Sequence, residues 1–211
     1  MATVAFQPSE CVVLRDVSWD FYERLLAEVS ESPGTRITFD QGLLQIMVIS
    51  AGHDKYNRSL QTLVQMIAFE MDLNFCCFGS MTFKRPDLRR GFEPDSCFYF
   101  QHADAMRPRM EIDPEVDPPP ELILEIDITR DSFDRFPIFA AMSVPEVWRY
   151  SDSGVTFFSL EGASYQAISR SKAIPILTPE TATHLLEEMM RLRPGPWRRK
   201  VQDWVRQQIG A

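Results

Sequence analysis

Residues 121–128 read Glu-Leu-Ile-Leu-Glu-Ile-Asp-Ile, and this stretch decides the fold. An almost continuous apolar run of this kind is typical of a central strand that is buried on both faces. Two carboxylates, Glu125 and Asp127, interrupt the run, and residues two apart in a strand point to the same face. Because burying two like charges is costly, the pattern indicates a compensating cation: a metal ion, or a basic side chain such as Arg130.

A second acidic position lies upstream, in the Pro-Asp pair that ends at Asp95. Proline fixes its own φ and biases the preceding residue toward an extended conformation, so Asp95 should open a strand over residues 95–101. If that strand pairs with the first one, Asp95, Glu125 and Asp127 converge on one point. Three carboxylates without a nearby His or Cys suit Mg²⁺ or Mn²⁺ better than zinc. Taken alone, a Pro-Asp pair also fits an ordinary turn.

Helix and strand patterns alternate on both sides of these strands, which predicts an α/β fold with a mixed sheet flanked by helices. A chain of 211 residues without a flexible linker predicts a single domain over residues 1–211. The proline-rich stretch 102–120 reads as a long loop, either without helix or with one short turn of it. We expect helices near residues 19–29, 53–73, 137–143, 179–192 and 197–209, and strands near 35–39, 43–50, 75–84, 95–101, 121–128, 146–150, 156–159 and 165–168.

The charge balance argues against general binding to nucleic acid. With 22 basic and 30 acidic residues the chain carries a formal net charge of −8, so DNA binding needs a local basic surface. A basic region over residues 191–206 also contains Trp197 and Trp204, which we expect to pack against the core or a partner subunit. The candidate DNA-binding residues, close in sequence to Asp95, are Lys84, Arg85, Arg89 and Arg90.

The compartment is predicted to be the cytoplasm. No apolar stretch is long enough to cross a bilayer, and the N-terminal residues lack a basic segment followed by a long apolar one. The four cysteines show no C-x-x-C spacing and read as free thiols in a reducing environment. We therefore expect no membrane partner.

The Pro-Asp pair followed by Glu125-Ile126-Asp127 resembles the PD-(D/E)XK signature of the restriction-endonuclease-like nuclease superfamily. More specifically, the chain is similar to a bacterial family of restriction endonuclease homologues long classed as a domain of unknown function. The resemblance implies an αβββαβ core over about residues 35–160, an extra N-terminal hairpin and a C-terminal helical extension over about 178–209. It also implies Mg²⁺-dependent phosphodiester hydrolysis with DNA as substrate. The matching passages are residues 82–88, 91–99, 117–129 and 136–150.

The chain departs from that pattern at Asp127, which stands where the superfamily places Lys. Relatives resembling this chain carry Lys or Arg at the position of Arg135, so the resemblance implies that Arg135 stabilises charge on the phosphate. Arginine does not deprotonate at physiological pH and cannot act as a general base, so the metal would have to activate the attacking water. The alternative for Arg135 is an ion pair with Asp131 or Asp134.

A second departure lies at the start of the long helix. Relatives usually carry Glu before His53, whereas this chain has Gly52, so a helix carboxylate ligand is missing unless Asp54 substitutes for it. His53 is expected either to orient water or phosphate at the site or to be an ordinary surface residue at the helix N-terminus.

The leading interpretation is a Mg²⁺- or Mn²⁺-dependent DNA endonuclease in which Asp95 and Glu125 hold the metal and Arg135 steadies the scissile phosphate. Asp127 is either a third metal ligand or a carboxylate outside the ligand shell. Because cutting both strands needs two sites, a homodimer is expected. The alternative is a catalytically inactive binding or assembly module, favoured by the missing Lys and the acidic charge. A third possibility is hydrolysis of a small phosphate ester.

Overall fold

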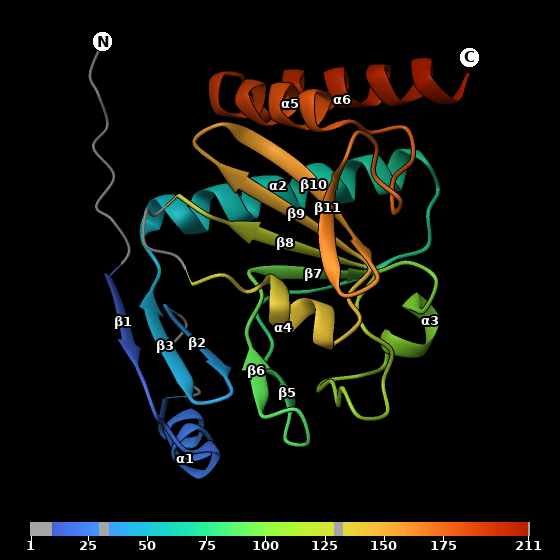
Figure 1. The fold of residues 1–211 in the computed structure, drawn as a ribbon. Coiled ribbons are helices and arrows are strands. Elements are labelled where there is room, and N and C mark those ends of the chain that lie inside the picture. Colours follow the sequence, from blue (N-terminus) through green and yellow to red (C-terminus); the bar gives the residue numbers. More distant parts are fainter. Residues whose placement is uncertain (1–9, 30–33, 129–132, 211) are drawn as a thin grey trace.

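The computed structural model describes residues 10–29, 34–128 and 133–210, which form two sheets and six helices (Figure 1). The six-stranded sheet has the order β11 (Ser164–Ile168), β10 (Gly154–Glu161), β9 (Glu146–Ser151), β8 (Leu122–Ile126), β7 (Ser96–Tyr99) and β4 (Cys76–Phe78). The five-stranded sheet has the order β1 (Glu10–Leu14), β3 (Leu43–Val48), β2 (Thr35–Asp40), β6 (Arg90–Phe92) and β5 (Phe83–Arg85). The helices are α1 (Trp19–Val29), α2 (Ala51–Glu70), α3 (Ala103–Met106), α4 (Phe136–Ala141), α5 (Pro179–Arg191) and α6 (Pro194–Ile209).

The apolar stretch that contains Glu125 forms the central strand β8, as its sequence predicts. All five of its residues are buried. It pairs antiparallel with β7 and parallel with β9, which makes the six-stranded sheet mixed. Residues Ser96 and Leu124 are partners in the β7–β8 pair, so the next position in that register brings Asp95 opposite Glu125.

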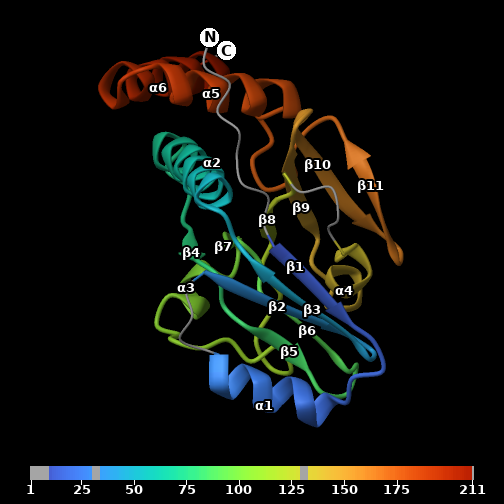
Figure 2. The same cartoon turned by 90° about the vertical axis from the view of Figure 1, so that its left-hand side faces the viewer.

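Alternate residues of β8 enter two different apolar clusters, as the two-residue period of a strand requires. Leu124 packs with α2 and with the C-terminal helices α5 and α6, which lie on one side of the sheet (Figure 2). Ile123 packs on the other side against Ile138 and Phe139 of α4. Glu125, next but one to Ile123, therefore belongs to the face that α4 covers.

The β2–β3 hairpin joins the two strands predicted near residues 35–39 and 43–50. Gln41 and Gly42 both have positive φ, 50° and 105°, which is the backbone conformation that tight hairpin turns require. Helix α1 lies at the end of the molecule opposite α5 and α6 (Figures 1 and 2). It packs on this five-stranded sheet through Tyr22 and Leu26, which are buried against Phe39.

The structure differs from the predicted elements in two respects. Residues 75–84 form β4 and β5, which belong to different sheets, because the chain leaves one sheet and joins the other within this stretch. Strands β1 and β6 were not predicted, since each is short and its apolar residues do not alternate. The short turn of helix allowed for within the loop over residues 102–120 is present as the single-turn helix α3.

The C-terminal helices match the predicted packing. Trp197 is buried in the core and its Nε1 donates a hydrogen bond to the Leu185 carbonyl at 2.8 Å. Basic residues of this region form ion pairs with the body of the protein, including Arg206 with Glu70 of α2. Among the described residues, no helix has the length and apolar character needed to cross a membrane.

Candidate active site

Asp95 lies at the head of β7 and is held from several sides. Its carboxylate is 1% exposed, and Oδ2 accepts a hydrogen bond from the Ile126 backbone N–H at 2.8 Å. The same oxygen lies 3.1 Å from Nε2 of His53, a residue of α2. The other oxygen, Oδ1, lies 3.9 Å from Nε of Arg36 on β2. The two sheets and α2 therefore meet at this one carboxylate.

The backbone around Asp95 is fixed as well. Asn57, one turn after His53 on α2, donates its side-chain N–H to the Asp95 carbonyl at 3.0 Å. The hydroxyl of Ser96 donates to Oδ1 of Asn57 at 2.9 Å. Helix α2 begins next to this point because Ser50 caps it, accepting the His53 backbone N–H at 3.2 Å. The capped helix end places both His53 and Asn57 against β7.

Glu125 is paired with Arg135 at the start of α4. Nη1 of Arg135 donates to Oε2 of Glu125 at 2.7 Å, and both side chains are buried. The predicted alternative partners of Arg135 were Asp131 and Asp134, of which Asp131 lies outside the described residues. Arg130, the alternative cation for the strand carboxylates, also lies outside them. The structure brings Arg135 to the acidic strand instead.

The pKa values of the two carboxylates move in opposite directions. Burial raises the pKa of Glu125 to about 7, against the opposing charge of Arg135 and with a further upward contribution from Asp95. Burial also acts upward on Asp95, but the contact with His53, the charge of Arg135 and the Ile126 N–H together hold the pKa of Asp95 below its usual value. At neutral pH, Asp95 is thus the firmly ionised member of the pair.

Each of the three predicted acids keeps an oxygen without a hydrogen bond. Among the described residues, Oδ1 of Asp95, Oε1 of Glu125 and Oδ1 of Asp127 are buried and accept none. Glu125 and Asp127 line one small cavity of about 30 Å³, together with Arg135 and Arg149. A volume of that size is comparable to one water molecule. Unsatisfied carboxylate oxygens beside such a space are the ligand type that Mg²⁺ prefers.

The carboxylates do not form a complete metal centre by themselves. Within residues 10–29, 34–128 and 133–210, no three His, Cys, Asp or Glu side chains are gathered closely enough to hold a metal ion. Mg²⁺ commonly uses only one or two protein carboxylates and completes its shell with waters and substrate phosphates. The residues present therefore fit such a partial site, in which Asp95 and Glu125 would be the protein ligands.

His53 is not a surface residue. It is 2% exposed, and its Nε2 lies 3.1 Å from Oδ2 of Asp95. The expectation of an ordinary exposed position at the helix N-terminus was therefore wrong. Asp54 forms an exposed ion pair with Arg58, with Nε and Oδ2 2.8 Å apart. It does not replace the carboxylate that the Gly52 position lacks.

Most of the predicted basic cluster is already neutralised by neighbours. Lys84 lies 3.1 Å from Glu23. Arg85 holds Asp87 through two nitrogens, at 2.8 and 2.7 Å. Arg90 contacts Asp40 at 2.7 Å. Arg89 is exposed, and the described part of the chain contains no ion pair that involves it.

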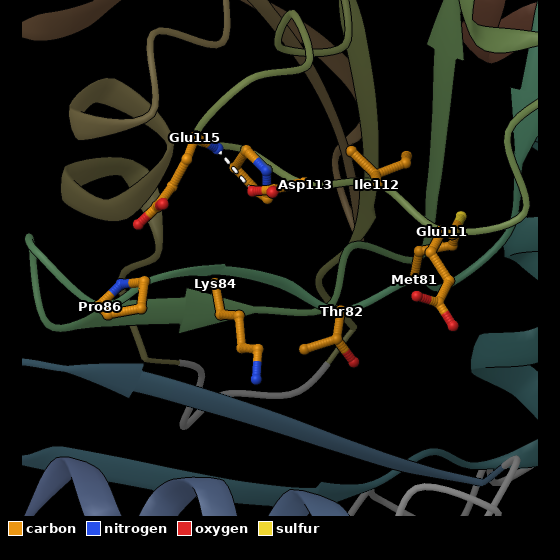
Figure 3. A pocket seen from close by; sticks show the side chains of 9 residues that line it. Met81, Thr82, Lys84, Pro86, Glu111, Ile112, Asp113 and Glu115 are labelled. Atoms are coloured by element: carbon orange, nitrogen blue, oxygen red, sulfur yellow. Dashed lines mark hydrogen bonds between the residues drawn. The ribbon is translucent and has the colours of Figure 1, made fainter.

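The surface beside Lys84 is acidic. A cavity of about 560 Å³ lies between β5 and the loop over residues 111–115 (Figure 3). Glu111, Asp113 and Glu115 line it, and the Glu115 backbone N–H donates to Oδ1 of Asp113 at 3.0 Å. The side chain of Lys84 reaches toward α1, where its partner Glu23 lies. This cavity repels phosphate and is separate from the Asp95–Glu125 site.

Sequence reasoning missed Arg36, Asn57 and Arg149. Arg36 and Asn57 reach Asp95 only because a second sheet and a helix meet at β7, and no local pattern predicts that meeting. Arg149 carried a usable signal, since it is a lone charge between Trp148 and Tyr150 in the strand parallel to the acidic one.

Comparisons with known proteins show the fold and the family of this chain. A solved structure from Anabaena variabilis ATCC 29413, described as a putative nuclease belonging to DUF820, aligns with a TM-score of 0.54 and 11% identity. The alignment covers 81% of this chain and 99% of that one, which shows a shared fold. No curated protein matches. A model of the Uma2 family, described as "putative restriction endonuclease", matches residues 19–190. This chain therefore belongs to the Uma2 family.

Proposed function

We propose that this protein is a Mg²⁺-dependent endonuclease that hydrolyses phosphodiester bonds of DNA. The observation that carries the proposal is the pairing of Asp95 with Glu125, each with a buried oxygen that no described residue satisfies. A buried carboxylate oxygen without a hydrogen-bond partner costs folding free energy unless a cation binds it. Mn²⁺ is expected to substitute for Mg²⁺, because both prefer oxygen ligands.

The residues of the chain divide the work of hydrolysis. Asp95 and Glu125 would hold the cation through their free oxygens, and His53 positions Asp95 through the contact of its Nε2 with Oδ2. When bound, Mg²⁺ would lower the pKa of water and stabilise charge on the phosphate. The water oxygen bonds to phosphorus and the water gives up one proton to solvent, while the phosphorus–oxygen bond to the leaving group breaks and the departing oxygen takes up one proton from solvent. Arg135 is fixed beside Glu125. Its positive charge would stabilise the phosphate while the phosphate carries additional negative charge during the reaction.

Asp127 has a lesser part in the proposal. Its backbone N–H donates to the Tyr150 carbonyl at 2.7 Å, so the chain stays in register with β9 just beyond the end of β8. Its side chain is half-buried at the same small cavity as Glu125. We assign it to the shell of groups around the cation, where it would accept hydrogen bonds from coordinated water.

A supercoiled-plasmid nicking assay in Mg²⁺ and in Mn²⁺ tests the proposal. Wild-type protein should nick the plasmid, and Glu125→Gln and Asp95→Asn should each lose the activity. Asp54→Asn is the matched control, because it removes an exposed acid of α2 that does not reach the site. Absence of nicking by the wild type with either metal, or full activity in Glu125→Gln, would contradict the enzymatic proposal.

One observation favours a second candidate, an inactive binding module. Arg135 already neutralises Glu125, which is the arrangement expected of a site that has lost its metal. Calorimetric titration with Mn²⁺ separates the two candidates. A nuclease should bind Mn²⁺ in a manner that depends on Asp95 and Glu125, whereas an inactive module should bind none.

We also propose a homodimer that works in the cytoplasm. Strand β1 is at the edge of the five-stranded sheet and exposes Val12, Val13 and Leu14 in succession. An apolar edge strand is suited to pairing with a second copy of itself. All four cysteines are free, which suits a reducing compartment. Sedimentation of wild type and Val13→Lys tests the dimer: the wild type should sediment as a dimer and the variant as a monomer.

A further inference from the structure

Arg149 stands beside Glu125 on the neighbouring strand. Strands β8 and β9 run parallel, and Glu125 and Arg149 are partners in their register. Both side chains line the small cavity that also contains Arg135 and Asp127. The positive charge of Arg149 acts downward on the pKa of Glu125, which places it within electrostatic reach of the site. The site therefore has two guanidinium groups on the α4 side of the sheet.

The two guanidinium groups differ in their availability. Arg135 is buried and donates to Glu125 at 2.7 Å. The side chain of Arg149 is 30% exposed, and its ion-pair partner Asp134 lies 3.9 Å away with a side chain that is itself 69% exposed. Exposed ion pairs at such distances contribute little and exchange readily with other partners. Arg149 can thus turn to an incoming anion without leaving a buried charge unpaired.

Aromatic rings hold Arg149 in place. Its Cζ atom lies 4.1 Å from the centroid of the Phe136 ring and 5.5 Å from that of Phe158. Stacking of this kind occupies a face of the planar guanidinium and leaves the N–H groups on its edge able to donate. Because Phe136 begins α4 directly after Arg135, the helix start orders both arginines.

We propose that Arg149 is the residue that binds the phosphate of the scissile group, donating from its guanidinium edge to a non-bridging oxygen. The inference rests on the proposed function and assigns the direct contact to Arg149, with Arg135 kept on Glu125. Guanidinium groups recognise phosphate through parallel N–H donors, which an ordered and incompletely neutralised arginine supplies. The ligand class is a phosphodiester of DNA.

Binding of a short fluorescent DNA duplex in Ca²⁺, which is expected to support binding without cleavage, tests this assignment. Arg149→Met keeps most of the side-chain length and removes the charge, and it should weaken binding roughly 10- to 100-fold, as loss of a charge-assisted hydrogen bond does. The slope of log K against log salt concentration should become about one unit less negative in Arg149→Met than in the wild type. In nicking assays the KM should rise more than kcat falls. Arg149→Lys should recover part of the affinity.

Arg198→Met is the matched control, because Arg198 is an exposed arginine of α6. Unchanged affinity and salt slope in Arg149→Met, with a melting temperature like that of the wild type, would overturn the assignment. So would an equal loss in Arg198→Met. A wild type that binds DNA through Arg149 but never nicks it would contradict the endonuclease proposal alone. A wild type that nicks DNA with no dependence on Arg149 would contradict this inference alone.

Discussion

Asp95 and Glu125 come opposite each other at the ends of β7 and β8, and their pKa values are displaced in opposite directions. Asp95 is stabilised as an anion by His53 and a backbone N–H, whereas Glu125 is buried with one arginine. Asp95 is thus an anion at neutral pH, whereas Glu125 changes its charge near neutral pH. Most of the expected behaviour of the site follows from this asymmetry.

The raised pKa of Glu125 predicts how stability depends on pH. A carboxyl whose pKa is about 7 in the folded protein and near 4.3 in the unfolded chain binds its proton more tightly when folded. Its stabilising contribution is therefore complete below about pH 4 and is lost as pH rises through 7. Urea denaturation in EDTA from pH 4 to pH 8 should show the wild type losing stability relative to Glu125→Gln. A constant difference across this range would contradict the assigned pKa.

Arg135→Met should destabilise the metal-free protein, because it leaves Glu125 buried without its cation. Breaking a buried ion pair in this way typically costs about 3–5 kcal/mol, and the loss should be greatest at pH 8, where Glu125 is ionised. Urea denaturation in EDTA measures it. Added Mn²⁺ should stabilise Arg135→Met more than the wild type, since the cation no longer competes with the guanidinium. Equal stabilisation of the two proteins would show that Glu125 is not a ligand.

His53→Ala should weaken metal binding without removing a ligand. His53 contacts Oδ2 of Asp95 and so fixes the direction of Oδ1. Loss of a group that orients a metal ligand typically costs about 10- to 100-fold in affinity. Mn²⁺ titration measures the change, and His184→Ala serves as control because His184 is exposed on α5. If His53→Ala bound Mn²⁺ with the affinity of the wild type, His53 would not be needed to position Asp95.

Gly91→Ala tests the packing between α1 and the five-stranded sheet. A Cβ at Gly91 would lie 2.1 Å from Oη of Tyr22 and 2.7 Å from its Cζ. Such overpacking typically costs about 1–3 kcal/mol. Tyr22→Phe removes the closest atom and should recover part of the loss. Gly79→Ala, with nothing within 4 Å of the added Cβ, should cost less in the same thermal denaturation assay. Equal losses at the two glycines would contradict this explanation.

The central strand and the site acids were predictable because their signals are local. An apolar run predicts that the strand is buried, and two carboxylates spaced two residues apart predict that both charges lie on one face of it. The two strands of the β2–β3 hairpin, predicted near residues 35–39 and 43–50, have equally local signals. The prediction of a single domain over residues 1–211 stays a prediction.

The partners of the acids were not predictable, because they come from elements distant in sequence. Arg36 reaches Asp95 from the other sheet, and the division of residues 75–84 between two sheets depends on tertiary packing. Pairing of basic side chains is also invisible in a linear pattern. Arg85 and Arg90 look available for DNA in the sequence, yet Asp87 and Asp40 hold them in the structure.

The most direct test of the account is anomalous diffraction from crystals soaked in Mn²⁺. The account predicts one peak within coordination distance of Oδ1 of Asp95 and Oε1 of Glu125, and no peak there in Glu125→Gln. Crystals of the wild type that show no peak at this place, with Arg135 still bound to Glu125, would contradict it.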